Sequence, residues 1–347
     1  MTDTSTFPTV SIVVPTHRRP QSLAMTLSSL LALDYPPDRY EIIVVDDGSG
    51  DDTPVVVAGL QCDARPKVVY IQQANSGVAT ARNQGARAAT GEILIFVDDD
   101  IVVEPSHVRD HLLTRDSHGD ALVNGHWEFP TELAQTLAAS PFGRFRLEVE
   151  QWVKDRIVKR PIGGGCEAPA GVTACNLAVR RALFWELGGF DETFPFAGSE
   201  DQELSFRADQ AGVPLVYDRR ITLIHNDQHL SLLQFCQRQR RGACTAVHLA
   251  GRHPDAFGGR PLITENSPIR RSDAARIVAK KMLKRGLVVP PVLAGIHLGV
   301  ELLERVAPNS RLLQRTYWFV CGLYIFKGVR EGFATVGSLP NALIPAG

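Results

Sequence analysis

The chain has 347 residues, of which 44% are hydrophobic and 22% are charged, so it can bury a sizeable core. Its formal net charge of -1 lacks the basic footprint of nucleic-acid-binding proteins, and we expect no nucleic-acid partner. It contains no uncharged apolar run of about 18 residues or more and no basic-then-apolar start typical of a signal peptide, so we expect a cytoplasmic protein.

Residues 10–100 alternate between strand-like and helical patterns. Four strands are predicted in runs rich in valine and isoleucine, at 10–14, 41–45, 67–71 and 92–97. Helices are predicted between them, at 21–33, 53–60 and 77–89. Because the strands are apolar on both faces, the sequence predicts a parallel sheet covered by helices, an α/β fold.

Each predicted strand is followed by a polar, turn-prone segment. These segments begin at Pro15, Asp46, Gln72 and Asp98. In open α/β sheets, ligands bind beyond the carboxyl ends of the strands. The sequence therefore predicts a polar rim at one edge of the sheet, which is the layout of a nucleotide site.

Three consecutive aspartates, Asp98, Asp99 and Asp100, follow the apolar run 93–97. Two carboxylates about 4 Å apart at an effective dielectric of about 20 repel by about 4 kcal/mol, so such a cluster needs a cation, a proton or bulk water. If the chain stays extended, Asp98 and Asp100 face the same way and offer two hard oxygen ligands to Mg²⁺ or Mn²⁺. The alternative is a solvated acidic turn.

The helix predicted at 77–89 carries a positive charge, Arg82, among small residues on its sheet-facing stripe. Positions 78 and 86 hold no carboxylate, so a local i,i+4 ion pair does not explain it. We expect Arg82 to bind a phosphate. The alternative is an arginine whose stem packs while its head reaches water.

The pattern loosens after residue 119. A helix is predicted around 142–158, and the glycine- and proline-rich residues 160–171 are interpreted as a mobile flap over a ligand. A strand at 173–179 and a helix at 181–187 follow. A further helix opens near Glu200 and Asp201, where acidic residues favour the helix N-terminus; for Glu200 this structural role is the preferred interpretation.

Taken together, these motifs resemble the family 2 nucleotide-sugar glycosyltransferases, which have the GT-A fold. The matching segments are Val10 to Pro15, Asp46-Asp47-Gly-Ser, Ala81-Arg82-Asn83-x-Gly85, the Asp98 and Asp100 pair, Gly188-Gly189-Phe190-Asp191-Glu192, and Glu200-Asp201. The resemblance covers about residues 8–228. It implies a Rossmann-like mixed sheet flanked by helices, with a nucleotide-binding half at 8–118, an acceptor half at 119–228, and a C-terminal helical appendage at 229–347.

The resemblance also implies site residues. Asp46 or Asp47 would accept a hydrogen bond from the imide of uracil or thymine, because an ionised carboxylate only accepts. The divalent metal, Mn²⁺ or Mg²⁺, would be held by Asp98, Asp100 and His225. The full set implied for the nucleotide is Pro15, Thr16, His17, Asp46, Asp47, Arg82, Asp98 and Asp99.

For catalysis, the resemblance implies that Asp201 is the general base. It would take the proton from an acceptor hydroxyl during a single in-line displacement that inverts the anomeric centre. The implied activity is an inverting, divalent-metal-dependent transfer of a sugar from a UDP- or dTDP-sugar to a hydroxyl of a glycan or lipid-linked acceptor, in the synthesis of cell-envelope polysaccharide or glycolipid.

Four further residues are candidates for contacts with the acceptor or the diphosphate: Glu200, Trp127, Arg238 and Arg241. The segment 237–242 resembles the Gln-x-x-Arg-Trp helix of processive polysaccharide synthases. Arg241 stands where that motif has tryptophan, which argues against processive synthesis. A solvated basic helix face is the alternative for this segment.

Beyond residue 265 the resemblance thins. Residues 270–285 contain seven basic side chains against one acid, Asp273, and apolar stretches follow at 287–303 and 317–326. This pattern predicts helices at an anionic membrane surface, and peripheral attachment to the cytoplasmic face. The alternative is a helical pair that packs on the core or forms the face of a homodimer.

Two other functions are open at this stage. A sugar-nucleotide pyrophosphorylase shares the α/β start, but it would carry a glycine-rich arginine loop where this chain has residues 15–20, Pro-Thr-His-Arg-Arg-Pro. A non-catalytic sugar-nucleotide-binding protein would leave the acids at positions 98, 100 and 201 idle, although unpaired buried charge is costly.

Overall fold

The computed structural model describes residues 7–60, 66–194, 196–227 and 229–336. The chain divides into two compact units. The first unit consists of Met1–Leu133, Trp152–Thr193 and Glu200–Asp227, and the second of Ala134–Gln151, Phe194–Ser199 and Gln228–Gly347. Two helices, α5 (Thr131–Ala138) and α6 (Pro141–Ile157), run across the boundaries between these segments.

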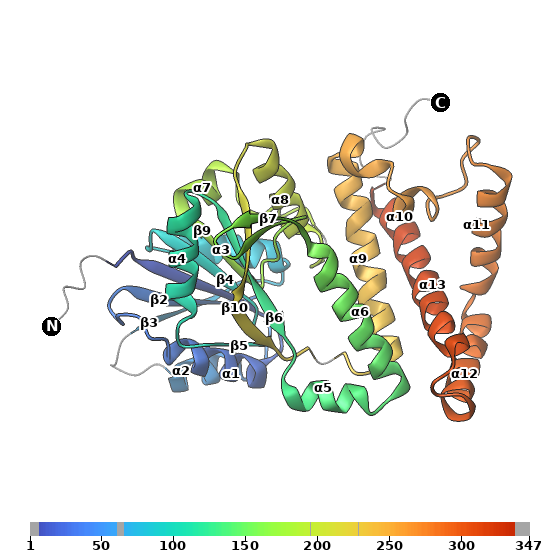
Figure 1. The fold of residues 1–347 in the computed structure, drawn as a ribbon, viewed down its shortest axis with the longest axis horizontal. Coiled ribbons are helices and arrows are strands. Elements are labelled where there is room, and N and C mark those ends of the chain that lie inside the picture. Colours follow the sequence, from blue (N-terminus) through green and yellow to red (C-terminus); the bar gives the residue numbers. More distant parts are fainter. Residues whose placement is uncertain (1–6, 61–65, 195, 228, 337–347) are drawn as a thin grey trace. The chain divides into compact units, whose positions relative to one another are not determined.

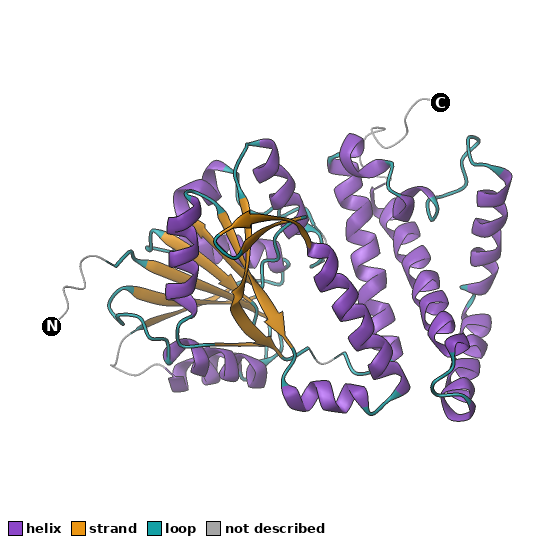
Figure 2. Ribbon diagram, viewed as in Figure 1, coloured by secondary structure: helices purple, strands orange, loops and turns teal. Residues whose placement is uncertain are grey.

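A mixed sheet forms the centre of the first unit (Figures 1 and 2). Its parallel part has the order β3-β2-β1-β4. These strands are β1 (Val10–Thr16), β2 (Tyr40–Asp46), β3 (Lys67–Gln72) and β4 (Ile93–Val97). All four were predicted from the sequence, because each is a compact run of β-branched residues bounded by turn residues.

Strands from the second half of the unit extend this sheet. Strand β9 (Asn176–Arg180) pairs antiparallel with β4, and the order continues β9-β6-β10-β8-β7, with β5 paired to β10. Their bounds are β5 (Ile101–Val103), β6 (Leu122–Glu128), β7 (Val158–Gly163), β8 (Cys166–Pro169) and β10 (Leu215–His225). The predicted α/β class with a mixed, helix-flanked sheet is confirmed.

Helices cover both faces of the sheet (Figure 2). One face packs against α1 (Pro20–Leu31), α2 (Thr53–Leu60) and α4 (His107–His118). The other packs against α3 (Val78–Ala88), α7 (Arg181–Glu186) and α8 (Glu200–Gln210).

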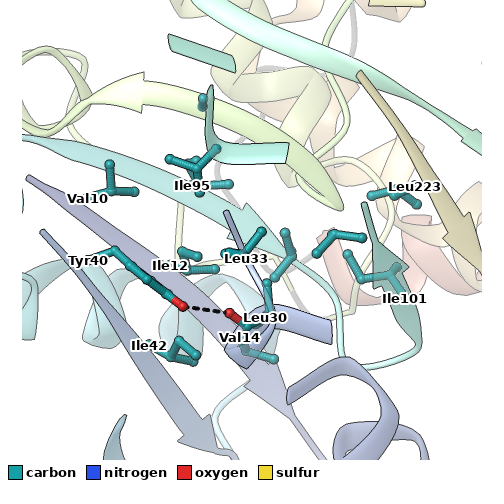
Figure 3. Packing of buried hydrophobic residues seen from close by; sticks show 14 of the residues in the cluster. Val10, Ile12, Val14, Leu30, Leu33, Tyr40, Ile42, Ile95, Ile101 and Leu223 are labelled. Carbon is teal, nitrogen blue, oxygen red and sulfur yellow. Dashed lines mark hydrogen bonds between the residues drawn. The ribbon is translucent and has the colours of Figure 1, made fainter. Parts of the chain in front are cut away.

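Alternation along the strands divides the core into two layers. In β1, Val10, Ile12 and Val14 join the layer under α1, whereas Val13 joins the layer under α3. Figure 3 shows the first layer, in which the Tyr40 hydroxyl donates a hydrogen bond of 3.1 Å to the Leu30 carbonyl oxygen. That bond satisfies a polar group inside an apolar layer.

Close packing holds α3 against the sheet. A Cβ atom on Gly85 would lie 2.4 Å from Cγ1 of Val13, so only glycine permits this approach. Gly85 lies about one helical turn after Arg82, so this close contact also fixes how near the backbone at Arg82 lies to the sheet.

The prediction of a mobile flap at 160–171 is wrong. Strands β7 and β8 form an antiparallel hairpin that belongs to the sheet. Three consecutive glycines, Gly163, Gly164 and Gly165, have φ values of 95°, 60° and 79° and form its turn. Glycine adopts these left-handed conformations without steric cost, so the composition that indicated mobility instead forms a tight turn.

A pair of buried histidines on α4 makes the stability of the first unit sensitive to acid. The ring centroids of His107 and His111 lie 4.7 Å apart, and His111 Nε2 is 2.8 Å from the Asn176 side-chain oxygen. Burial lowers the pKa of His111 to about 4, and burial and then His111 lower the pKa of His107. Neither ring is expected to carry a charge at neutral pH.

Acidification should therefore destabilise this unit. An unfolded histidine binds a proton near pH 6.5, whereas folded His111 does so only near pH 4, so the free energy of unfolding falls as the pH drops below about 6.5. We expect His111→Gln to reduce the loss of stability between pH 7.5 and pH 5 by about 2 kcal/mol, measured by urea denaturation. Ser117→Ala, at an exposed and non-titrating position of the same helix, is the control and should leave that loss unchanged. An identical pH dependence in wild type and His111→Gln would contradict this origin of the acid sensitivity.

The second unit is helical. Its helices are α9 (Leu232–Arg252), a π-helical turn (Pro254–Gly258), α10 (Pro261–Thr264), α11 (Ala275–Leu287), α12 (Pro290–Val306) and α13 (Arg311–Val336). Helix α13 packs along α9 (Figure 1). The rings of Phe145 and Tyr317 lie 5.0 Å apart, and those of Phe145 and Phe235 6.3 Å apart.

The prediction that residues 317–326 form a helix at a membrane interface is wrong, because most of this segment is packed inside the second unit. Tyr317, Tyr324 and Phe326 are buried, and only Trp318 and Phe319 are about half exposed. The packed-helix alternative holds for this stretch. Among the described helices, none is individually long and apolar enough to cross a bilayer; α11 and α12, joined through an 85° bend, pass that criterion only as a pair.

Candidate active site

Loops at the carboxyl ends of β1, β2 and β3 are tied to one another. His17 Nδ1 lies 2.9 Å from the Asp47 carbonyl oxygen, and His17 Nε2 lies 3.4 Å from the Asn75 side-chain nitrogen. The Arg18 amide donates to Ser49 Oγ at 2.8 Å, and Arg18 has a positive φ of 56°. A non-glycine residue in this conformation is rare and is often found at functional sites.

The two aspartates of the β2 turn hold these loops in place. Asp46 is fully buried and accepts hydrogen bonds from the Ser49 amide at 2.8 Å and the Tyr70 hydroxyl at 2.7 Å. Asp47 is also buried; its carboxylate accepts from the Gln73 side chain and from the amides of residues 76 and 77, all within 2.8 Å. Both carboxylates therefore shape the loops that would line a base. Pro15 lies within β1, where its backbone is buried beside β2.

The three aspartates lie in a turn, so the chain does not stay extended past Val97. The expectation that Asp98 and Asp100 face the same way is wrong, because their carboxylates engage different partners. Asp98 pairs with Arg82, whereas Asp100 lies between Arg19 and His225. The turn separates the acids because β5 follows immediately, at Ile101, and pairs with β10.

Arg19 partly neutralises the cluster. Its NH1 atom lies 3.1 Å from Asp99 Oδ1 and 2.9 Å from Asp100 Oδ2, and Thr16 Oγ1 donates to Asp99 at 2.7 Å. Burial raises the pKa of Asp99 to about 6 although Arg19 and Thr16 oppose the shift. Burial also opposes ionisation of Asp100, but His225 and Arg19 outweigh it and lower its pKa. Sequence analysis did not single out Arg19; its position directly after β1, opposite the acidic turn, is the signal that was available.

The donor atoms fit a divalent cation. Asp100 Oδ1 is buried, has no well-formed hydrogen bond among the described residues, and lies 3.3 Å from His225 Nε2. A carboxylate and an imidazole are suitable ligands for Mn²⁺, which also takes phosphate oxygens. No group of three or more His, Cys, Asp or Glu that could hold a metal is found in the part of the chain described here.

Arg82 connects two acids that are distant in sequence. Its NH1 atom lies 2.7 Å from Glu200 Oε1, its NH2 atom lies 2.7 Å from Asp98 Oδ1, and its guanidinium carbon is 5.5 Å from the Phe190 ring centroid. Arg82 and Glu200 are both buried. The charge of Arg82 is thus explained without a phosphate and without snorkelling to water. Glu200 is the partner of a buried charge, which is more than the helix-terminal role predicted for it.

Asp201 follows Glu200 in the first turn of α8 and is half-buried. Its pKa is raised to about 7, first by burial and then by the negative charge of Glu200, against the opposing effect of Arg82. A carboxyl group with a pKa near neutrality is suited to accept a proton at physiological pH. Asp201 therefore differs from Asp98 and Glu200, whose carboxylates are ion-paired with Arg82.

Three further candidates are Trp127, Arg238 and Arg241. Trp127 is 7% exposed and packs in the core layer under α1, so it presents little surface to an acceptor. Arg238 and Arg241 are exposed residues of α9 and belong to the second unit. The structure does not bring Trp127 together with the acids, and the roles of the two arginines stay predictions.

Comparison with known proteins places this site in a family. The chain is 30% identical over 236 residues to a validoxylamine A glucosyltransferase from Streptomyces hygroscopicus subsp. limoneus; the match covers 62% of this chain and 51% of the relative, so the chain spans about half the relative's length. The fold is similar to that of a Pyrobaculum calidifontis mannosyltransferase solved with GDP-Man and Mn²⁺, with a TM-score of 0.60, 17% identity, and coverage of 98% of this chain and 89% of that one. It is also similar to that of GalNAc-T7 solved with UDP, GalNAc and Mn²⁺, with a TM-score of 0.54, 16% identity, and coverage of 80% and 54%.

The family assignment rests mainly on the first unit. Residues 11–187, slightly more than half of the chain, match the family described as Glycosyl transferase family 2. They include β1 to β4 and the loops that carry the acids at positions 46, 47, 98, 99 and 100. The chain is a member of glycosyl transferase family 2.

Proposed function

We propose that this protein is an inverting, divalent-metal-dependent glycosyltransferase that moves a sugar from a nucleoside-diphosphate donor to a hydroxyl group of a glycan or lipid-linked acceptor. The catalytic domain is assigned to residues 8–228. The observation that carries the proposal is the pair of ion pairs that joins Glu200 through Arg82 to Asp98, at the start of the acidic turn, with Asp201 and its raised pKa directly after Glu200.

On this proposal, the loops after β1 and β2 bind the nucleoside. Asp47, His17 and Asn75 are hydrogen-bonded together there, which supports a preformed base and ribose site. UDP- and dTDP-sugars are the proposed donors, because the carboxylate of Asp47, the less completely buried of the two acids in the β2 turn, can accept from the imide of their bases. One structural neighbour was solved with GDP-Man and another with UDP, so GDP-sugars are tested beside UDP- and dTDP-sugars.

Asp100 and His225 are the proposed metal ligands. When bound, Mn²⁺ or Mg²⁺ supplies Lewis-acid stabilisation of the departing diphosphate. Arg19 bridges Asp99 and Asp100 and is 49% exposed, so its side chain can move aside or turn toward the diphosphate. Arg82 lies between Asp98 and Glu200, holds both carboxylates in position and keeps them apart.

Asp201 is the proposed general base. Its carboxylate takes the proton from the acceptor hydroxyl as that oxygen attacks the anomeric carbon, and the bond from this carbon to the diphosphate oxygen breaks. A single displacement of this kind inverts the anomeric configuration. The raised pKa of Asp201 favours proton uptake near neutral pH.

We further propose that the acceptor belongs to cell-envelope polysaccharide or glycolipid synthesis and that the protein works in the cytoplasm, peripherally on the membrane. Exposed apolar residues on α11 and α12, among them Met282, Leu283 and Leu298, support such attachment. So does the excess of basic side chains in 270–285.

The direct test is release of nucleoside diphosphate from a panel of UDP-, dTDP- and GDP-sugars, with Mn²⁺ and with a chelator. We expect metal-dependent release from one donor class. Donor binding without any turnover, with water or with hydroxyl acceptors, would instead support a non-catalytic sugar-nucleotide-binding protein.

The metal ligands can be tested separately. Asp100→Asn is expected to raise the Mn²⁺ concentration for half-maximal activity by about tenfold or more, because it replaces a charged oxygen ligand by a neutral one. Asp116→Asn, an exposed residue of α4, is the control and should leave the Mn²⁺ dependence unchanged. An unaltered Mn²⁺ titration in Asp100→Asn would exclude Asp100 as a ligand.

A further inference from the structure

A hollow in the helical unit has three cationic side chains among its six lining residues. Its volume is about 330 Å³, and its lining residues are Arg285 and Val288 at the end of α11 and Lys327, Arg330, Glu331 and Ala334 of α13. The four α13 residues recur at helical spacing and therefore share one face of that helix. Three of the six lining side chains are positive and one is negative.

The single acid of this pocket is already paired. The two carboxylate oxygens of Glu331 each lie 2.6 Å from the guanidinium group of Arg240 on α9. This two-point contact raises the pKa of Arg240. Glu331 is therefore engaged by Arg240, and among the described side chains no ion pair joins it to Lys327, four residues before it on the same helix.

Neighbouring acids are engaged with other bases. Glu265 pairs with Lys280, and Asp273 pairs with Lys281. Among the residues that the structure describes, no ion pair joins Arg285, Lys327 or Arg330 to a carboxylate. Lys284, whose ammonium lies 5.7 Å from the Phe326 ring, has a pKa lowered first by burial and then by Lys280, as expected where positive charge is in excess.

Helix electrostatics explain only one of the three pocket cations. Arg285 lies in the last turn of α11, where the macrodipole favours positive charge. Lys327 and Arg330 lie before the last turn of α13, which contains no basic residue, and at i,i+3 spacing they repel each other. Lys327 is also half-buried. An anion with several acceptor oxygens would relieve this repulsion, and arginine binds phosphate through paired N–H groups.

Exposed apolar side chains adjoin the pocket residues in sequence. Met282 and Leu283 precede Arg285 and are 55% and 63% exposed, and Val289 and Val292 follow Val288 and are 44% and 42% exposed. A phosphate held by the cations would thus have exposed apolar side chains nearby in sequence, on α11 and at the start of α12. We propose that this pocket binds the phosphate group of an anionic lipid headgroup. This inference rests on the peripheral attachment proposed above and names the headgroup contact through which it would act; the pocket residues belong to the second unit.

The test uses the full chain, inorganic phosphate, and phosphatidylcholine vesicles with and without phosphatidic acid. The pocket variant is Arg285→Gln/Lys327→Gln/Arg330→Gln. The matched control is Arg276→Gln/Arg305→Gln/Arg315→Gln, which removes the same charge from exposed arginines of α11, α12 and α13 that do not line the pocket. Single Lys327→Gln is made in parallel, so that a folding defect in the triple variant does not decide the outcome.

We expect wild type to sediment with vesicles that contain phosphatidic acid, and the pocket variant to bind them about tenfold or more less tightly than the control variant. Inorganic phosphate should raise the melting temperature of wild type and of the control variant saturably, but not that of the pocket variant, and it should compete with the vesicles. Single Lys327→Gln should show an intermediate loss.

Three results would overturn the proposal. Equal loss of vesicle binding in the two triple variants would show general attraction to a charged surface. Phosphate stabilisation that persists in the pocket variant would place the anion elsewhere. Phosphate stabilisation without any preference for phosphatidic acid would show that the phosphate comes from a soluble compound.

Discussion

Asp201→Asn is expected to lower sugar transfer by about 10²- to 10⁴-fold, because the amide cannot take the proton from the acceptor hydroxyl. Binding of the donor should change little, since the donor diphosphate is assigned to Asp100, His225 and the loops after β1 and β2. Turnover is measured with the donor class found in the nucleotide-sugar panel. Asp209→Asn, exposed on the same helix, is the control and should keep wild-type activity. Near-normal turnover in Asp201→Asn would remove this residue from the role of base.

The pH dependence of wild type gives an independent check of the same residue. The pKa of Asp201 is raised to about 7, so the ionised, proton-accepting form increases between pH 6 and pH 8. Activity should rise over that interval with a midpoint near pH 7 and then level off. A profile that is flat from pH 6 to pH 8 would show that a different group accepts the proton.

The same substitution should affect stability in the opposite direction to activity. Folded Asp201 keeps its proton up to about pH 7, whereas the unfolded chain releases it near pH 4, so ionisation of Asp201 lowers the free energy of unfolding as the pH rises through 7. Asp201→Asn removes that charge. Its melting temperature should exceed that of wild type, and by more at pH 8 than at pH 6.

Arg82→Met is expected to lower the free energy of unfolding by about 3–5 kcal/mol, because it leaves the buried carboxylate of Glu200 without its cation. Both members of that pair are almost completely buried, at 5% and 3% side-chain exposure, and 2.7 Å separates their polar atoms. Urea denaturation at neutral pH measures the loss. Activity should fall as well, since Arg82 also holds Asp98 at 2.7 Å.

Arg87→Met is the matched control for this substitution. Arg87 lies on the same helix and pairs with Glu192 at 2.7 Å, but both side chains are more than one third exposed. Its loss should cost at most about 1 kcal/mol, as for other surface ion pairs. The double variant Arg82→Met/Glu200→Gln should recover part of the stability, because no unpaired buried charge remains at position 200. Equal losses for Arg82→Met and Arg87→Met would contradict the buried-pair interpretation.

The parallel strands and their helices could be predicted because their signals are local. β1, β2, β3 and β4 are short runs of valine and isoleucine between turn residues, and the structure starts and ends each of them within two residues of the prediction. Helix α2 has the predicted bounds, Thr53–Leu60. The family resemblance then ordered these elements into the GT-A sheet, which the comparisons support.

Partnerships over long sequence distances could not be predicted in this way. Arg82 and Glu200 are 118 positions apart, so a search at i±4 found no partner for the arginine. Arg19 and Asp99 are 80 positions apart, and their contact depends on the parallel pairing of β1 with β4. A sequence pattern shows which residues carry charge, but the fold decides which charges meet.

Local sequence signals also gave wrong predictions where one composition is compatible with two local conformations. Gly163, Gly164 and Gly165 were interpreted as part of a flap, yet they form the turn of a hairpin. The alternation assumed for Asp98 and Asp100 failed because a turn replaces the extended chain after Val97. In both cases the pairing of a following strand, β8 or β5, imposed the backbone conformation.

In the proposed mechanism, Asp100 binds the metal whereas Asp201 accepts the proton. Calorimetric titration tests this assignment most directly: the active donor is titrated into wild type, Asp100→Asn and Asp201→Asn, with Mn²⁺ and with a chelator. The account predicts that Asp201→Asn binds the donor within about threefold of wild type and remains metal-dependent, whereas Asp100→Asn loses the metal-dependent part of the affinity. Unchanged metal-dependent binding in Asp100→Asn, together with lost binding in Asp201→Asn, would contradict it.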